Sequence, residues 1–500
     1  MRNFSILFLL LCAVLPLKAQ TNSVQSRALS LEDCITIALE HNLTIQITRY
    51  NPMIAQYSLA GSYGDYEPTL TLSAQHDYSL SPGGVDDEGR PFGGNETDVD
   101  RISGGLQGLL PLGTVYSLGA NFADRIDDQP LVGEFETTSG QVGAFSLRQP
   151  LLKNLWIDGT RLNIYVSKRE LGIRESDFRD QVMTTITAVE DAYFNLIFSE
   201  GNVKVQEKAL ELAERLLAEN KRRVQVGALA PLDEKQSESQ VASSRADLLS
   251  AQAQRDTQQR VLKALLSDDY TNEWAGAVIA PTDKLLAVPQ HYDLQESWRR
   301  GLSQGPRLSQ ARLALEQQKQ RVRFQRNQVY PQVDVVGSYG YSAGGNSQEY
   351  SDAMGQIADR DNPFWSFGAQ LSIPLGQTGA RNNLKIAKAS QEQMALTLKQ
   401  QEQQTLILIE NAIANARSSY ERVDATRQFR LYAEAALDAE QKKLESGKST
   451  SFVVLQLQKD LTDASSAEIR ALADYNITLA NLALAEGSTF ERRKINLEIK

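Results

Sequence analysis

The chain has 500 residues with 52 basic and 62 acidic side chains, which gives a formal net charge of −10. This acidity excludes a nucleic-acid partner, because phosphate binding requires a basic surface. The chain holds three histidines and two cysteines, without a His-Glu-x-x-His motif or a cysteine pair at metal-ligand spacing. We therefore expect no metal site, no cofactor and no catalytic activity.

Residues 1–19 have the order of a secretory signal peptide. Arg2 precedes an apolar run from Phe4 to Leu17, and the small residue Ala19 follows. The run is shorter than the roughly 20 residues that a membrane-spanning helix needs, so we expect export and cleavage after Ala19. Cys34 is then the only cysteine of the mature chain, which leaves no intramolecular disulfide.

The sequence from 20 to 149 combines a helical segment with strands. Residues 20–65 are helix-like, whereas residues 66–149 contain runs in which polar and apolar residues alternate in part with period two, as in half-buried strands. These runs are Thr69–Ala74, Ile102–Leu109, Thr114–Phe122 and Gln141–Leu147. Stretches rich in Gly, Asp and Asn between them predict exposed loops.

A long helical hairpin is predicted over residues 150–266. No proline interrupts the segment from Gly159 to Gly227, which would reach about 100 Å as continuous helix. Gly227 suits the left-handed position just past a helix end, and Pro231 with Asp233 suits the first turn of the next helix. The chain therefore turns back near 227–233.

The rest of the sequence repeats this order. We assign a linker to 267–291, a helical segment to 292–329, strands to 330–374, a second long hairpin to 375–487 with its tip near 447–453, and a tail to 488–500. The strand-like runs are Gln332–Tyr341 and Trp365–Ile373, and no proline lies between Gly379 and Gly447. Apolar residues at spacings of four and three, such as Leu457, Leu461 and Ala464, indicate coiled-coil packing after this tip.

Paired landmarks indicate that the two halves are internal repeats. Glu190 and Glu410 lie in the similar motifs Val-Glu-Asp-Ala and Ile-Glu-Asn-Ala, and they are 220 residues apart. The tip glycines Gly227 and Gly447 have the same separation. A duplication of strands followed by a helical hairpin explains this common offset better than chance does.

The order of these features resembles the outer membrane efflux (TolC-like) family from about Leu29 to Gly487. The resemblance rests on Leu-Ser-Leu-Glu-Asp-Cys-Ile-Thr-Ile-Ala-Leu-Glu-His-Asn from Leu29, on the doubled strand entries at Tyr66 and Tyr330, and on Gly-Lys-Ser-Thr-Ser-Phe-Val-Val-Leu from Gly447. It implies an α+β membrane protein of the cell outer membrane. Three copies would share one β-barrel, with about four strands per copy, continued by a long periplasmic α-helical barrel.

The resemblance further implies a function and partners. The chain would be the outer-membrane exit duct of a tripartite efflux or type I secretion system and would conduct substrate passively. Its partners would be two further copies, a periplasmic adaptor (membrane fusion) protein, an inner-membrane transporter and outer-membrane lipid. A periplasmic structural or adhesive coiled-coil protein without channel activity is the alternative, which the heptads alone favour and which membrane partitioning would distinguish.

The same resemblance implies positions for the functional residues. The tip turns would contact the adaptor through Gly227, Ala228, Leu229, Gly447, Lys448 and Ser449. The candidate residues lining the entrance are Asp233, Val453, Gln456 and Asp460. In the family, acids near the second tip narrow the entrance, but those positions are Val453 and Gln456 here, so the gate of this chain differs from the family pattern.

Two placements are open for the candidate hairpin from Ile102 to Phe122. It either extends a strand pair outward as an extracellular loop or enters the barrel wall, in which case each copy contributes six strands. By analogy with the long outer loops of membrane barrels, we favour the extracellular placement.

Overall fold

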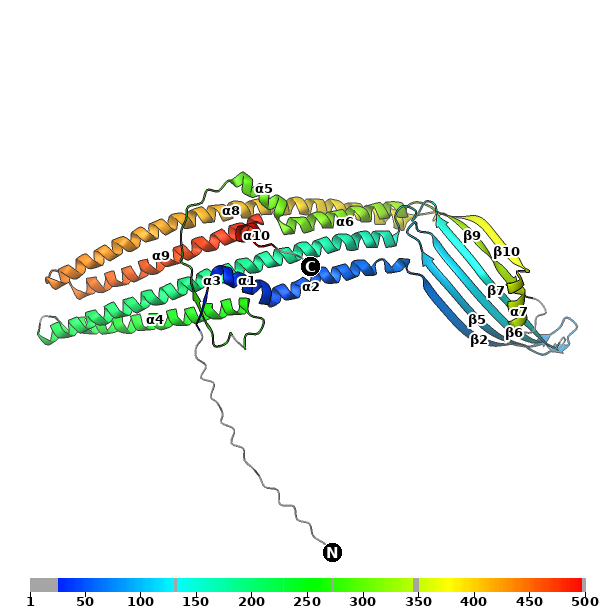
Figure 1. Ribbon diagram of the computed structural model, residues 1–500, viewed down its shortest axis with the longest axis horizontal. Helices are drawn as coiled ribbons and strands as arrows, with labels where there is room; N and C mark the ends of the chain where they lie inside the picture. The colour runs from blue at the N-terminus through cyan, green and yellow to red at the C-terminus, as the bar shows by residue number, and fades with distance from the viewer. Residues whose placement is uncertain (1–25, 130–132, 228, 272–273, 345–349, 497–500) are drawn as a thin grey trace, which may run out of the picture.

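The computed structural model describes residues 26–129, 133–227, 229–271, 274–344 and 350–496. The signal peptide predicted over residues 1–19 and the tip residue Ala228 lie outside this described part. Figure 1 shows an elongated molecule with long helices over most of its length and a single large β-sheet at one end. The C-terminal helix lies near the middle of the helical part.

Two helical hairpins of matching size form the long part of the molecule. The first consists of α3 (Gly159–Gln225) and α4 (Pro231–Leu266), and the second consists of α8 (Thr378–Glu445) and α9 (Ser451–Glu486). α3 and α8 have 67 and 68 residues, and α4 and α9 have 36 each. α3 packs against α9, so the two hairpins lie side by side (Figure 1).

Near the sheet, two shorter helices complete a layer of four. α2 (Leu43–Gly61) packs against α3, and α6 (Pro306–Gln328) lies between α3 and α8. The side-chain amides of Gln317 and Gln318 fix this order, because they donate to the Val166 carbonyl of α3 at 3.0 Å and to the Ala387 carbonyl of α8 at 2.9 Å. The layer therefore runs α2, α3, α6, α8 near the sheet and α4, α3, α9, α8 toward the tips.

A buried core in the middle of the molecule joins distant parts of the chain. β1 (Ser26–Leu29) pairs in parallel with β8 (Val278–Pro281), and α1 (Leu31–His41) packs beside them with Cys34 fully buried. The hydroxyl of the buried Tyr193 in α3 donates at 2.8 Å to the Asp283 carboxylate just after β8. The sequence did not predict this ladder, because a four-residue strand has too little periodicity to detect.

The remaining helices of this region lie around the core. They are α5 (Leu294–Gln304), which packs against α8 and α9, and α10 (Thr489–Arg493), which packs against α3 and α9. Arg493 of α10 pairs with the carboxylate of Glu190, whose side chain is almost fully buried in α3. The end of the described chain is therefore anchored to the first long helix.

Six antiparallel strands form the large sheet, in the order β10-β9-β7-β6-β5-β2. Their bounds are β2 Thr69–Ser81, β5 Asn95–Leu109, β6 Val115–Gln129, β7 Gly133–Pro150, β9 Gln332–Ala343 and β10 Pro363–Ser372. All six runs predicted as strands fall on these elements, and only Thr114 and Ile373 lie one residue outside β6 and β10. At the far end of the sheet lie a two-stranded ribbon of β3 (Gly84–Val85) and β4 (Pro91–Phe92), and α7 (Tyr350–Asp359), which packs on β7 and β9.

The hairpin of β5 and β6 corrects one expectation. We expected residues 102–122 to extend outward as an extracellular loop and the sheet to hold about four strands, but both strands lie between β2 and β7 along their whole length. Their turn lies at the helix end of the sheet, where a Cβ on Gly113 would be 3.0 Å from the carbonyl oxygen of Asn154. The extracellular placement was wrong, because alternation is the same in a wall strand and in an extended loop.

Candidate functional site at the sheet and the hairpin tips

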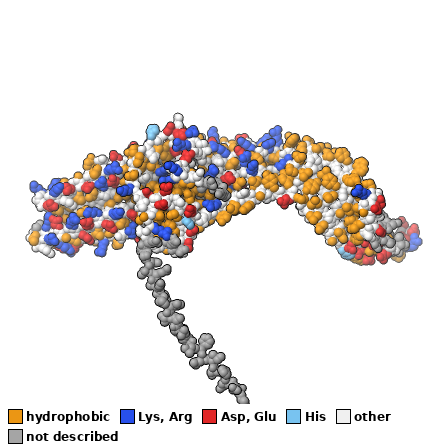
Figure 2. Space-filling model, in the orientation of Figure 1, with side chains coloured by type: hydrophobic (Ala, Val, Ile, Leu, Met, Phe, Trp, Pro, Cys, Tyr) orange, Lys and Arg blue, Asp and Glu red, His pale blue; other side chains and the backbone are white. Residues whose placement is uncertain are grey.

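One face of the sheet carries a continuous apolar surface. In a single register row across all six strands, every side chain on this face is large and apolar. The row consists of Leu70, Leu106, Leu118, Phe145, Tyr339 and Trp365. Leu70 is 66% exposed and Trp365 76% exposed, and neighbouring Phe367 is 78% exposed. Figure 2 shows this hydrophobic surface over the sheet.

The apolar surface has the height of a membrane. From Pro363 in β10 to Ile373 just beyond it, an apolar side chain recurs at every second residue. At about 3.3 Å per residue and a strand tilt of about 40°, this stretch spans about 25 Å, the height of the apolar band on outer-membrane barrels. In the part of the chain that the structure describes, no helix is both long and apolar enough to cross a membrane.

The opposite face of the sheet is polar. The adjacent register row has only small or polar residues, namely Thr69, Gln107, Ser117, Ser146, Ser338 and Ser366. Neighbouring serines bond across the strands, with Oγ to Oγ distances of 2.7 Å for Ser117 with Ser146 and for Ser338 with Ser366. A sheet with one apolar and one polar face separates lipid from water when it closes into a barrel.

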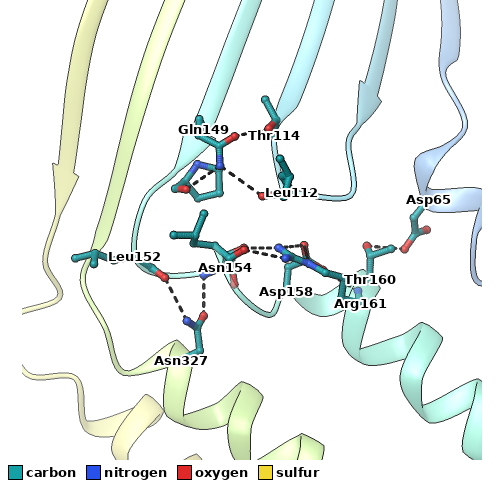
Figure 3. A network of polar contacts seen from close by, with 12 residues as sticks. Asp65, Leu112, Thr114, Gln149, Leu152, Asn154, Asp158, Thr160, Arg161 and Asn327 are labelled. Carbon is teal, nitrogen blue, oxygen red and sulfur yellow. Dashed lines mark hydrogen bonds and ion pairs between the residues drawn. The ribbon is translucent and has the colours of Figure 1, made fainter.

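A polar network joins the sheet to the helices (Figure 3). Asp158 caps α3 by accepting from the Arg161 backbone N–H at 2.7 Å, and the Arg161 guanidinium donates at 2.8 Å to the carbonyls of Asn154 and Leu155. Asn327 at the end of α6 accepts from the Asn154 backbone N–H at 2.7 Å. The loop between β7 and α3 is thus held from two helices, which fixes the angle between sheet and helices.

The first hairpin tip turns at Gly227, as predicted. Gly227 has φ +75° and its N–H donates to the Val224 carbonyl at 3.0 Å, in a conformation that penalises a Cβ. Leu229 is half-buried beyond the turn, and Pro231 opens α4. The Asp233 carboxylate accepts from the Ala230 backbone N–H at 3.2 Å, so Asp233 caps α4.

The second tip turns at Gly447, which has φ +72°. The N–H groups of Gly447 and Lys448 donate to the carbonyls of Leu444 at 3.1 Å and Lys443 at 2.9 Å, which is the Schellman arrangement. Lys448 is exposed, whereas the Ser449 hydroxyl donates to Glu440 on the preceding helix. The exposed turn is therefore available to a partner.

A buried polar link joins the two tips. Asn220 of α3 is fully buried; its amide donates to the Ser237 hydroxyl of α4 at 2.8 Å and accepts from the Ser451 hydroxyl of α9 at 3.1 Å. Arg223 adds a second link by donating to the Leu444 carbonyl of α8 at 3.2 Å. No local sequence signal marks these residues as partners, because Asn220 and Ser451 are 231 positions apart.

The structure divides the candidate entrance residues into two groups. Val453, Gln456 and Asp460 lie on one side of α9, and Gln456 donates to Asp460 at 2.9 Å. Val453 is 39% exposed and Gln456 is exposed. Asp233 lies apart from them, in the capping bond at the start of α4.

One carboxylate in the middle of α3 has a shifted pKa. Burial, together with the neighbouring charge of Glu190, raises the pKa of Asp191 from its ordinary value to about 6. Its Oδ1 has no hydrogen-bond partner among the described residues. Glu190 itself is paired with Arg493, and burial lowers the pKa of Arg492 beside it. The Asp191 carboxylate therefore titrates closer to neutral pH than an ordinary aspartate does.

The fold and the two-faced sheet define a class of protein in which a membrane β-sheet continues into long helical hairpins. The profile of the outer membrane efflux protein family matches residues 136–267 and 299–488, more than half of the chain, so the chain belongs to this family. The match includes both long hairpins but leaves out β2, β5 and β6.

Known relatives agree with this membership. The chain is 24% identical to the outer membrane protein TolC of Escherichia coli strain K12 over 332 residues, which is 65% of this chain and 66% of that protein, just under two thirds of its length. Its fold is similar to a membrane protein from Pseudomonas aeruginosa, with a TM-score of 0.68, 18% identity and coverage of 93% and 92% of the two chains. It is also similar to the Campylobacter jejuni CmeC outer membrane channel, with a TM-score of 0.66, 15% identity and coverage of 92% and 86%.

Proposed function

We propose that this chain is an outer-membrane exit duct that conducts substrate passively from the periplasm to the exterior, as part of a tripartite efflux or type I secretion system. The observation that carries the proposal is the sheet with one apolar face of membrane height and one polar face, continued by helices of 67 and 68 residues. Lipid accepts a sheet only when its edges are closed. The long helices continue this passage through the periplasm.

Closure requires further copies, and a homotrimer is the assembly that we propose. β2 and β10 are the two edges of the sheet, and each has one unpaired side. The helical layer has matching edges, because α2 exposes an apolar stripe of Ile47, Tyr50, Ile54 and Tyr57, while α8 exposes Ile386 and Leu396. Pairing β2 of one copy with β10 of the next would cover both kinds of edge at once.

The dimensions support a barrel of eighteen strands. Strands about 4.8 Å apart with a tilt of about 40° give a barrel about 36 Å across for eighteen strands but about 24 Å for twelve. Three copies of a four-helix layer give a ring of twelve helices, which at about 9 Å between axes is about 35 Å across. A barrel with six strands per copy therefore matches the width of the helical tube. The β5–β6 hairpin supplies the two strands per copy that a twelve-stranded barrel would lack.

The hairpin tips form the periplasmic entrance in this assembly, and they contact the periplasmic adaptor that joins the duct to an inner-membrane transporter. The exposed turn residues Gly227, Gly447 and Lys448 support this contact, with Leu229 and Ser449 beside them. A groove of about 650 Å³ between α3, α4 and α9 lies further along the hairpins from the tips and is lined mostly by polar residues such as Ser243, Ser250 and Asp247. A narrow helical partner fits such a surface.

The gate that we propose is a set of links between the hairpins rather than an acidic ring. Asn220 and Arg223 hold the first hairpin to the second, and both links must break for the tips to separate. Val453, Gln456 and Asp460 line the entrance from α9. Asp233 stands at the start of α4, where it would add one negative charge per copy.

The test uses the purified full chain in planar lipid bilayers. We expect discrete channel conductance and a trimeric mass, whereas a monomer without channels would overturn the proposal. Two arginine substitutions on β2 provide a matched pair. Leu72→Arg places a charge on the apolar face, which costs about 2–4 kcal/mol in lipid, and it should abolish membrane insertion, while Ser73→Arg on the polar face should insert. Equal insertion of the two variants would contradict the assignment of the faces.

A further inference from the structure

The surface of α6 is basic in a chain that is acidic overall. Every α6 side chain that is exposed is a lysine or an arginine. These residues are Arg307, Arg312, Lys319, Arg321, Arg323 and Arg326. Arg307 pairs with Asp180 at 3.0 Å and Arg312 with Glu402 at 3.4 Å. For Lys319, Arg323 and Arg326, called the basic stripe below, the described part of the chain offers no ion-pair partner within salt-bridge distance.

The basic stripe lies along one side of the helix. At 100° per residue, its three residues and Arg312 fall within an arc of about 60°, whereas Arg321 points to the opposite side. α6 lies between α3 and α8, so these neighbours cover its flanks and leave two free sides. The edges of the helical layer are α2 and α8, so a neighbouring copy would leave the stripe uncovered.

The stripe faces the same side as the apolar surface of the sheet. Gln328, at the end of α6, lies in a pocket of about 310 Å³ together with Gln332 and Ser372. Gln332 and Ser372 are register partners on the polar face of the sheet. Arg326 precedes Gln328 by two residues and points about 200° away from it. Figure 2 shows Lys and Arg side chains over the helices next to the hydrophobic sheet surface.

The stripe also lies at the right height for a membrane surface. α6 ends at Gln328 and β9 begins at Gln332, so Arg326, Arg323 and Lys319 lie about 3, 8 and 14 Å below the helix end. The headgroup layer of one leaflet is about 5–8 Å thick, and long basic side chains reach toward it. The exposed aromatics Trp156 and Tyr330 lie at this junction, 82% and 49% exposed, as is typical of membrane interfaces.

We propose that the basic stripe binds the phosphate groups of anionic phospholipids in the periplasmic leaflet of the outer membrane. Guanidinium groups bind phosphate through two parallel hydrogen bonds, and an ammonium group adds a point charge. The proposal rests on the proposed function, because only an inserted sheet brings the stripe to the leaflet. Each basic side chain near an anionic surface is expected to raise local lipid affinity about fivefold.

The experiment uses the full chain in phosphatidylcholine vesicles with a minor share of phosphatidylglycerol. Spin-labelled forms of both lipids report how strongly the protein holds each. We expect a preference for phosphatidylglycerol that weakens with salt and falls on the order of fivefold per charge removed in the triple variant Lys319→Gln, Arg323→Gln, Arg326→Gln. A triple variant with the wild-type preference would overturn the proposal.

Two single variants serve as matched controls. Arg312→Gln removes a charge from the same side of α6 but about 24 Å below the helix end, and Arg321→Gln removes one from the opposite side. Both variants should keep the wild-type preference for phosphatidylglycerol. If Arg321→Gln lost as much of this preference as the triple variant, the lipid effect would lie on the opposite side of α6, inside the proposed helical tube, and the proposal would be overturned. Unchanged thermal unfolding of the triple variant checks that it folds.

Two further measurements distinguish this proposal from failure of the proposed function and from binding to the cell wall. Channel conductance is measured in the same membranes: a conducting protein without lipid preference rejects only the stripe, whereas a protein that neither conducts nor restricts lipid rejects the proposed function. Binding to purified cell-wall glycan that disappears in the triple variant, with lipid preference unchanged, would assign the stripe to the cell wall and overturn its assignment to lipid.

Discussion

Replacing Asn220 by alanine removes the buried link between the two hairpin tips. In the wild type, Asn220 accepts from the Ser451 hydroxyl at 3.1 Å and donates to the Ser237 hydroxyl at 2.8 Å. Ser237 keeps its bond to the Asp233 carbonyl at 2.9 Å in the variant, but Ser451 loses its acceptor in a buried site. The change therefore acts mainly on the contact between hairpins.

The expected magnitude follows from this geometry. A buried hydrogen bond contributes about 1 kcal/mol net, so the three copies of the proposed trimer, if they open together, would lose about 3 kcal/mol of preference for the closed tip. Since 1.4 kcal/mol is tenfold, the ratio of open to closed entrances should rise on the order of 100-fold. Single-channel recording in planar bilayers measures this as a higher resting open fraction.

The control and the decisive result use serines of the same helix. Ser465→Ala removes a hydroxyl that bonds only to the Leu461 carbonyl of its own helix, at 2.7 Å, and should leave the open fraction unchanged. Ser451→Ala should reproduce Asn220→Ala, and the double variant should add little. If Asn220→Ala opens no more often than Ser465→Ala, the link does not hold the entrance closed.

Three further predictions concern other positions. Gly447→Ala, at φ +72°, should destabilise the tip by about 1 kcal/mol, whereas Gly379→Ala in the first turn of α8 should not. Thermal unfolding in detergent compares the two variants, and equal melting temperatures would contradict the turn argument. Asp191→Asn should stabilise the protein by about 1 kcal/mol at pH 7.5 and should have no effect below pH 3.8. The pKa of Asp191 in the folded protein is raised to about 6, so the wild type loses stability as pH rises through that value and its carboxyl group ionises, whereas asparagine stays neutral. Thermal unfolding at both pH values tests the sign. Asp233→Ala should raise resting conductance and lower cation preference if the carboxylate lines the entrance, and unchanged selectivity would leave Asp233 with capping alone.

The sequence predicted the elements better than their assembly. The long helices were predicted from proline-free segments of the sequence that end at Gly227 and Gly447. Both glycines have the positive φ that a left-handed residue just past a helix end requires. The strands followed from alternation of period two. Alternation does not report which strands are neighbours, however, so the β5–β6 hairpin was placed outside the sheet that contains it.

The links that matter at the tips could not be predicted. Asn220 and Ser451 are single polar residues in long helices, and only the packing of α3 against α9 brings them together. The parallel pairing of β1 with β8 has the same origin, because Ser26 and Val278 are neighbours only in space. Local pattern determines local structure, whereas contacts between distant segments depend on the whole fold.

The buried thiol of Cys34 makes the molecule convenient for site-directed labelling. Burial raises the pKa of this thiol to about 12, and its side chain is 0% exposed, so it stays un-ionised and unreactive in the folded protein. Among the described residues it is the only free cysteine. Within the part of the chain that the structure describes, a cysteine introduced at an exposed tip position such as Lys448 would therefore be the one site that a maleimide dye modifies. Once the predicted signal peptide with Cys12 is cleaved, motions of the hairpin tip could be followed by fluorescence without first replacing Cys34.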